Sequence, residues 1–155
     1  MKHSYTKYLD KDSLILSNST TKADAFKEIS ERAAMFCNLD AGAILRLMNQ
    51  REQMMTTGVG CGLGLPHIRT KGKMRPIVIA LVTKEPITDY ESSDGNDVRV
   101  LMFLMASDED QNAYLQLLGS ISRRLRHPER IEEVIENITR PSVILRILKK
   151  RPISE

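Results

Sequence analysis

The stretch Thr56-Thr57-Gly58-Val59-Gly60-Cys61-Gly62-Leu63-Gly64-Leu65-Pro66-His67 decides how the rest of this chain is organised. Glycine stands at four alternate positions, Gly58, Gly60, Gly62 and Gly64. Because glycine has no Cβ, an extended segment with this pattern has one bare face, against which another backbone or a bulky anion can lie. Pro66 fixes its own φ and keeps the preceding residue extended, so we expect His67 to be held at the end of the segment. A histidine held there suits either a structural turn or chemistry.

The composition is that of an ordinary globular protein, with 41% hydrophobic and 28% charged residues among 155. We expect a single domain over residues 1–155 with one core. A formal charge of +3 and the lack of tryptophan argue against a nucleic-acid partner. Cys37 and Cys61 form no CxxC pair, which indicates reduced thiols and a cytoplasmic location. The longest apolar runs, 77–82 and 100–106, have the length of strands, so no membrane insertion is expected.

Apolar periodicity predicts a strand, two helices, about three strands and then three helices, in the order β-α-α-β-β-β-α-α-α. This order indicates an α/β fold, a layered α/β/α sandwich with a mixed sheet of about four to five strands. The basic segment 69–75 is predicted to be a solvated loop, and the charged residues of the last three helices a solvated face. The expected helix starts are Ser19, Thr20 or Thr21, then Asp40, Ser107 or Asp108, Pro128 and Pro141.

Arg51 interrupts the apolar stripe of the second expected helix, seven residues after Ile44. One interpretation is an internal salt bridge, or a side chain that reaches the surface. The other is that the guanidinium points across the glycine segment towards an anion, for which its planar fork is well suited. The sequence leaves both interpretations open.

The glycine segment does not match the common nucleotide-binding loops. No register gives GxGxxG, and no lysine stands where a Walker loop needs one. His67 has no partner at a metal-ligand spacing, since the other histidines are His3 and His127, and no serine lies in a GxSxG elbow. We therefore expect no nucleotide, no metal and no hydrolase triad.

Three segments in a fixed order do resemble a known family. Arg51-Glu52, Thr56-Thr57-Gly58-Val59-Gly60 and Gly62-Leu63-Gly64-Leu65-Pro66-His67 resemble the signature of the type 2 EIIA domains of the bacterial phosphoenolpyruvate-dependent phosphotransferase system, the fructose, mannitol and nitrogen-related group. The turn at Asp94-Gly95, the strand at 98–105 and the helical segment 113–118 also follow the family's order. The resemblance thus covers nearly the whole chain.

The resemblance implies a phosphoryl carrier that needs no cofactor. His67 would accept a phosphoryl group from an HPr-like phosphocarrier protein and pass it on. A neutral imidazole is a good nucleophile near neutral pH, and positioning and electrostatic stabilisation do most of the catalysis in phosphoryl transfer. Arg51, the Thr57 hydroxyl and backbone N–H groups of the segment 58–64 could stabilise the phosphoryl group, while Pro66 would fix the direction of attack.

Three positions depart from the family's pattern. Ile68 follows the histidine where a small residue is usual, and Gly64 stands where alanine is common. Tyr114 stands where phosphotransfer members usually carry a second histidine. A tyrosine hydroxyl can donate a hydrogen bond but stays neutral, so we expect slower or more weakly stabilised phosphorylation of His67. Alternatively, Tyr114 simply begins the apolar stripe of its helix.

Three functions are compatible with these features. The first is a regulatory protein of the nitrogen-related type that signals to a target protein by its phosphorylation state, and the lack of an attached EIIB or membrane domain favours it. The second is a sugar-transport EIIA of the fructose or mannitol type that passes phosphate to an EIIB. The third is a phosphorylation-impaired binding module, suggested by Tyr114.

Overall fold

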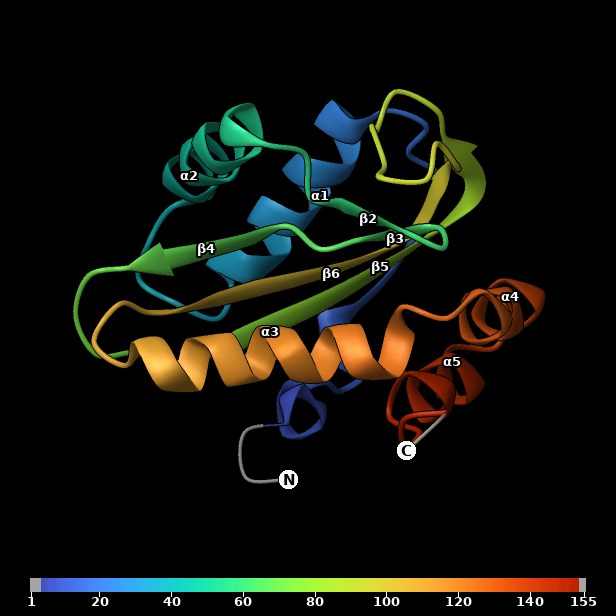
Figure 1. Ribbon diagram of the computed structural model, residues 1–155. Helices are drawn as coiled ribbons and strands as arrows, with labels where there is room; N and C mark the ends of the chain where they lie inside the picture. The colour runs from blue at the N-terminus through green and yellow to red at the C-terminus, as the bar shows by residue number, and fades with distance from the viewer. Residues whose placement is uncertain (1–3, 154–155) are drawn as a thin grey trace.

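A mixed sheet of six strands lies between two layers of helices in the computed structural model, which describes residues 4–153 (Figure 1). The strands are β1 (Leu14–Ser17), β2 (Gly58–Gly60), β3 (Leu63–Gly64), β4 (His67–Thr70), β5 (Ile77–Ile87) and β6 (Val98–Ser107). The helices are α1 (Lys22–Ala34), α2 (Ala41–Met54), α3 (Gln111–Leu125), α4 (Pro128–Glu136) and α5 (Pro141–Leu148), with short 3-10 turns η1 (Tyr5–Tyr8) and η2 (Lys11–Ser13). The predicted α/β/α sandwich is confirmed.

The two faces of the sheet are covered by different helices (Figure 1). Alternate residues of β6 point to opposite sides: Phe103 belongs to the apolar cluster under α1 and α2, and Met102 to the cluster under α3, α4 and α5. Both side chains are fully buried. This explains the apolar run of β6, because a strand covered on both faces carries apolar residues at every position. Among the described residues, no helix combines the length and the apolar character needed to cross a membrane.

Two short strands share one edge of β6. β3 pairs with β6 in parallel, with Leu63 opposite Val100, and β4 continues along the same edge with His67 opposite Leu104. Leu65 and Pro66 separate the two strands, and the Leu104 N–H donates to the Pro66 carbonyl at 3.1 Å. His67 is therefore tied to a central strand of the sheet.

The sheet has six strands rather than the predicted four to five because the glycine segment itself forms β2 and β3. These strands have three residues and two residues, too few for an alternating apolar pattern to reveal them. The basic segment was also partly misassigned. Arg69 lies in β4 opposite Ala106 rather than in a solvated loop.

Most of the expected helix starts are confirmed. Thr21 caps α1 and Asp40 caps α2 through side-chain oxygens, while Pro128 and Pro141 open α4 and α5. The start of α3 was predicted too early, because β6 continues to Ser107 and the capping residue is Asp110, whose carboxylate accepts from the Ala113 N–H at 3.0 Å.

One arginine of the last helices is buried, contrary to the expected solvated face. Arg130 is 5% exposed and donates to the carbonyls of Arg124, Lys150 and Arg151 at 3.1, 3.3 and 2.8 Å. Carbonyl groups near helix ends lack intrahelical partners, so a buried guanidinium can satisfy several of them at once.

Candidate functional site

His67 opens β4 and leaves one ring nitrogen available for chemistry. Its side chain is half-buried, and Nδ1 lies 2.7 Å from the Leu65 carbonyl oxygen. A carbonyl can only accept, so Nδ1 carries the proton in the neutral imidazole and Nε2 carries the lone pair. Pro66 is the residue between His67, which donates this bond, and Leu65, which accepts it. The local backbone therefore selects the tautomer in which Nε2 is the nucleophile.

Burial lowers the pKa of His67 below its usual 6.5, and the nearby cations Arg51 and Arg69 lower it further. The Leu65 carbonyl and the Glu52 carboxylate act in the opposite direction. Because burial dominates, the imidazole is neutral near pH 7. A neutral imidazole is the form that can attack an electrophile.

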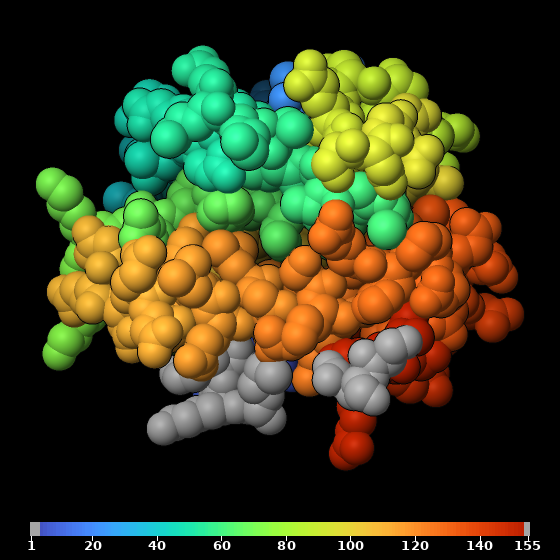
Figure 2. Space-filling view, viewed as in Figure 1, coloured from blue at the N-terminus to red at the C-terminus, as the bar shows by residue number. Residues whose placement is uncertain are grey.

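His67 faces an open cavity of about 740 Å³ between α2 and α3. Figure 2 shows the surface hollowed between the teal α2 and the orange α3. Its lining includes His67, Arg51, Arg69, Lys71, Tyr114 and Asp108. Among the described residues that line it, three are cationic and one is a carboxylate, so the cavity favours an anion. Within residues 4–153, no group of three or more His, Cys, Asp or Glu residues could hold a metal ion.

Arg51 lies in the last turn of α2 and reaches this cavity. Its Nη1 donates to the carbonyl of Met55 at 2.9 Å, and Met55 is the C-cap residue that follows the last helical residue. A guanidinium carries five N–H donors, and this bond uses one. The structure therefore brings Arg51 and His67 to one open cavity, where the guanidinium reaches the surface, so both interpretations of the interrupted apolar stripe stay open.

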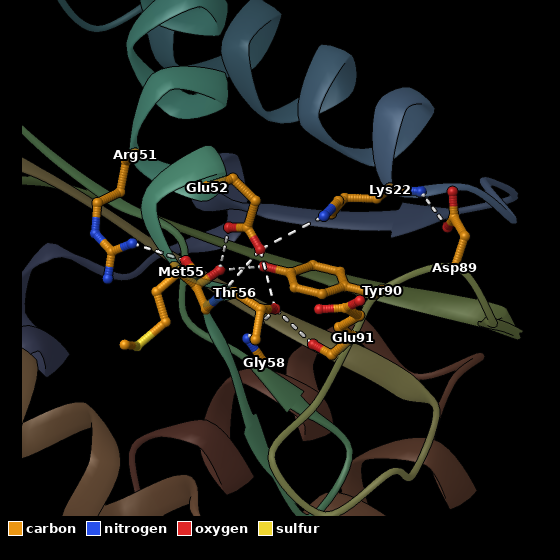
Figure 3. Close-up of polar contacts among 10 residues, drawn as sticks. Lys22, Arg51, Glu52, Met55, Thr56, Gly58, Asp89, Tyr90 and Glu91 are labelled. Atoms are coloured by element: carbon orange, nitrogen blue, oxygen red, sulfur yellow. Dashed lines mark hydrogen bonds and ion pairs between the residues drawn. The ribbon is translucent and has the colours of Figure 1, made fainter.

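Glu52 leaves the same turn on the opposite side and holds the start of the glycine segment (Figure 3). Its carboxylate accepts from the Thr57 N–H at 3.0 Å, from the Thr57 hydroxyl at 2.7 Å and from the Thr56 hydroxyl at 3.1 Å. Lys22 forms an ion pair with it at 3.6 Å, and the Glu52 side chain is 6% exposed. Glu52 belongs to the motif that carries the family resemblance, but the sequence did not indicate its role in the site.

Thr57 is not brought to the cavity. It is 2% exposed, and its hydroxyl lies between the Glu52 carboxylate and the Tyr90 hydroxyl, 2.5 Å away. Burial raises the pKa of Tyr90 far above its usual range, so the phenol keeps its proton and can donate to Thr57. The Thr57 side chain is thus buried against Glu52 and Tyr90, where it holds the start of the glycine segment, and it does not line the cavity of His67.

Protein fills the bare face of the glycine segment. A Cβ on Gly58 would lie 2.1 Å from the Glu91 carbonyl oxygen, and one on Gly64 would lie 3.1 Å from the Tyr90 ring and hydroxyl. The segment is not extended throughout as expected, because it turns back at Cys61 and Gly62 between the antiparallel strands β2 and β3, with positive φ at Gly60, Cys61 and Gly62. Of the two uses expected for the bare face, close approach of another segment is the one observed at Gly58 and Gly64.

Tyr114 lies beside His67, where the resemblance places a second histidine in other members. The two ring centroids are 6.1 Å apart at an angle of 56°. Burial raises the pKa of Tyr114 to about 12, although the cations Arg69 and Arg51 oppose the shift, so the phenol is neutral. Tyr114 also belongs to the apolar cluster under α3. Tyr114 therefore fits both expectations: it lies beside His67, and it begins the apolar stripe of its helix.

Arg69 is the site residue that sequence reasoning misassigned. Its guanidinium lies over the Tyr114 ring, 5.4 Å from the centroid, and it lines the same cavity as His67. Strand spacing could have revealed it, because residues i and i+2 of a strand point to the same side.

Comparison with known proteins identifies the family. A sequence profile described as "Phosphoenolpyruvate-dependent sugar phosphotransferase system, EIIA 2" matches residues 7–151. The chain is 31% identical over 104 residues to the fructose-specific EIIA component of the phosphotransferase system of Haloferax volcanii. The aligned region covers 67% of this chain and 67% of the relative. It is 30% identical over 106 residues to a nitrogen regulatory protein of Bradyrhizobium diazoefficiens, covering 68% of this chain and 69% of the relative.

Solved structures share the fold. The nitrogen regulatory protein IIA-Ntr of Neisseria meningitidis superposes with a TM-score of 0.81 at 18% identity, over 93% of this chain and 98% of that one. The IIA mannitol domain of Escherichia coli gives a TM-score of 0.74 at 19% identity, over 90% and 98%. Since the family profile covers nearly all of the described residues, the chain belongs to the EIIA 2 family of the phosphoenolpyruvate-dependent sugar phosphotransferase system.

Proposed function

We propose that the protein is a phosphoryl carrier whose acceptor atom is Nε2 of His67. The observation that carries this proposal is the hydrogen bond from Nδ1 to the Leu65 carbonyl, which fixes the tautomer and leaves the lone pair on Nε2 of a histidine that lines a cationic cavity. The lowered pKa of His67 supports it, because the imidazole needs no deprotonation near pH 7. Membership of the EIIA 2 family gives the class of reaction.

The transfer is a displacement at phosphorus between two imidazoles. The Nε2 lone pair of His67 forms a new N–P bond while the N–P bond to the donor histidine of an HPr-like protein breaks, and that donor nitrogen keeps the electron pair. The Nδ1 proton remains shared with the Leu65 carbonyl throughout and stabilises the positive charge that develops on the His67 ring. The second transfer, to an acceptor protein, reverses these steps.

Arg51 stabilises the phosphoryl oxygens in this scheme. Its hydrogen bond to the Met55 carbonyl holds the guanidinium at the edge of the cavity. The Arg51 side chain therefore loses less conformational entropy when it binds the phosphoryl group. Glu52 and Thr57 contribute indirectly. They hold the chain directly before β2, and the Thr57 carbonyl accepts from the Leu65 N–H at 2.9 Å, so their bonds help to position Leu65, whose carbonyl orients His67.

A regulatory role of the nitrogen-related type is our first choice of pathway. Relatives named nitrogen regulatory protein include the one from Bradyrhizobium diazoefficiens, and the IIA-Ntr structure gives a TM-score of 0.81. The second candidate is transfer to an EIIB in sugar transport. The relative from Haloferax volcanii, named as a fructose-specific component, supports it, as does a solved complex of the mannitol IIA and phosphorylated IIB enzymes of Escherichia coli. In either pathway we expect a cytoplasmic protein that needs no cofactor.

The test is phosphorylation in a reconstituted pathway. The protein is incubated with phosphoenolpyruvate, enzyme I and HPr from one organism, and intact mass is measured. We expect one added phosphoryl group on the wild type and none on His67→Gln, which preserves volume and hydrogen bonding. A wild type that gains no mass, or a His67→Gln variant that gains as much, refutes the carrier. Phosphorus–nitrogen couplings in NMR spectra then locate the group on Nε2 or Nδ1.

A second step separates the pathways. Purified EIIB proteins are added to the phosphorylated protein, and loss of the phosphoryl group is followed by mass. Rapid, EIIB-dependent loss identifies a transport component. Retention of the group in the presence of every EIIB of the organism supports the regulatory role. A phosphorylation-impaired binding module would fail already at the first step.

A further inference from the structure

Arg69 and His67 occupy the same side of β4. Residues two apart in a strand point to one face and are separated by about 6.6 Å along the chain. Ile68 between them is 5% exposed and packs in the cluster under α1 and α2, so its neighbours face the other way. Both of these neighbours line the cavity between α2 and α3.

Two side chains of α3 contact the Arg69 guanidinium. The Tyr114 ring lies under it, with 5.4 Å from Cζ to the ring centroid, and the Gln111 side-chain carbonyl accepts a hydrogen bond from Nη1. Gln111 and Tyr114 are three residues apart, so they lie on one face of the helix. An exposed arginine without such contacts samples many rotamers, whereas these contacts restrict Arg69 to the cavity side.

We propose that Arg69 is the second cation that stabilises the phosphoryl group on His67, and that Tyr114 is the residue that positions it. This inference rests on the proposed function and deepens it. The charge beside the phosphoryl group comes from β4, two residues after the acceptor, while α3 supplies a neutral aromatic surface. Tyr114 then acts through Arg69, and its ring matters more than its hydroxyl.

Arg69 as an ordinary surface contact and Arg69 as a cation that stabilises the phosphoryl group predict different effects of its removal. An exposed arginine that stacks on a tyrosine contributes at most about 1 kcal/mol to folding stability, so its removal is expected to lower the unfolding temperature by no more than about 4 °C. A cation that bonds phosphoryl oxygens makes a charge-assisted contact, and loss of such a contact slows a reaction roughly 10- to 100-fold. The phosphorylation rate and the unfolding temperature therefore distinguish the two roles.

The test compares variants that separate charge from ring. Arg69→Gln removes the charge but keeps a hydrogen-bonding side chain, and Arg69→Lys keeps the charge but loses the planar stack. Tyr114→Phe keeps the ring without the hydroxyl, and Tyr114→Leu removes the ring. The control is Arg46→Gln, an exposed arginine on α2 outside the residues that line the cavity. Transfer from phosphorylated HPr is measured at limiting concentration, together with phosphohistidine hydrolysis and thermal unfolding.

We expect Arg69→Gln to slow transfer roughly 10- to 100-fold while it lowers the unfolding temperature by no more than about 4 °C, and Arg69→Lys to recover part of the transfer rate. Tyr114→Phe should keep most of the wild-type transfer rate. Tyr114→Leu should slow transfer as much as Arg69→Gln does, although the loss of a buried ring should also lower its unfolding temperature. The double variant Arg69→Gln/Tyr114→Leu should transfer no more slowly than either single variant. Arg46→Gln should match the wild type.

Three results would overturn the proposal. One is an Arg69→Gln variant that is phosphorylated as fast as the wild type. Another is a Tyr114→Phe variant as slow as Tyr114→Leu, which would assign the role to the hydroxyl. The third is a double variant whose loss is the product of the single losses. Failure of the carrier function itself looks different, because the wild type would then accept no phosphoryl group.

Discussion

Removing the Glu52 carboxylate tests whether the glycine segment is held from the end of α2. Glu52→Ala removes the acceptor for two donors, the N–H and the hydroxyl of Thr57, and the ion pair to Lys22. The Thr56 hydroxyl loses only its longer contact and keeps the Glu91 carbonyl as acceptor at 2.6 Å. Because the side chain is 6% exposed, water cannot fully replace it. Hydrogen bonds to charged groups contribute about 1.5–3 kcal/mol each but are not additive within one network, so we expect a loss of about 2–4 kcal/mol.

The assay is thermal unfolding followed by circular dichroism. For a chain of this length each kcal/mol lowers the unfolding temperature by about 2–4 °C, so Glu52→Ala should unfold roughly 5–15 °C below the wild type. Glu52→Gln keeps the shape and one carbonyl acceptor, and its loss should be about half as large. The matched control is Glu31→Ala, an exposed glutamate on α1, which should change stability by less than about 0.5 kcal/mol.

The same variants probe the route from Glu52 to His67. If the carboxylate positions the strand before Leu65, the chemical shifts of the His67 ring should change in Glu52→Ala more than in Glu31→Ala. A Glu52→Ala protein as stable as the wild type, with unaltered His67 resonances, would refute the view that this carboxylate supports the site.

Other changes give further predictions. Titration of His67 by NMR should give a pKa below 6.5, and Arg51→Gln should raise it, because burial and the Arg51 cation both disfavour the charged ring. Folding stability should therefore fall as the pH drops through about 6.5, in the wild type but not in His67→Gln, and equal slopes would contradict the lowered pKa. Gly64→Ala should cost about 1–3 kcal/mol in urea unfolding, since its Cβ would meet Tyr90 at 3.1 Å; an unchanged midpoint would show that the ring can move. Tyr114→His should accept phosphate faster and hold it longer, and a variant that does neither would show that a histidine there adds nothing.

The sheet and the helix starts could be predicted because their signals are local. β5 and β6 are continuous apolar runs, and a side chain such as Asp40 caps the helix that begins beside it. The position of His67 at the end of the glycine segment could be predicted as well, since Pro66 acts on the adjacent backbone. These features depend on a few neighbouring residues, which is the range over which propensity and periodicity carry information.

The supports of the site depend on contacts distant in sequence. Thr57 meets Tyr90 across 33 residues, and Arg69 meets Gln111 across 42. Nothing near Thr57 indicates that a buried tyrosine and a carboxylate occupy its hydroxyl, so its predicted place beside the phosphoryl group was reasonable from sequence and differs from its place in the structure. Arg69 was missed because four basic residues in seven resemble a loop when their strand partner is unknown.

The bond between the Pro66 carbonyl and β6 has a consequence for how a partner would sense phosphorylation. His67 directly follows a backbone segment that is already paired with a central strand, so we expect attachment of a phosphoryl group to need no hinge or ordering transition there. A phosphoryl group adds between one and two negative charges near neutral pH. We therefore expect the two states to share one shape and to differ in surface potential, so that partner discrimination would weaken with rising ionic strength.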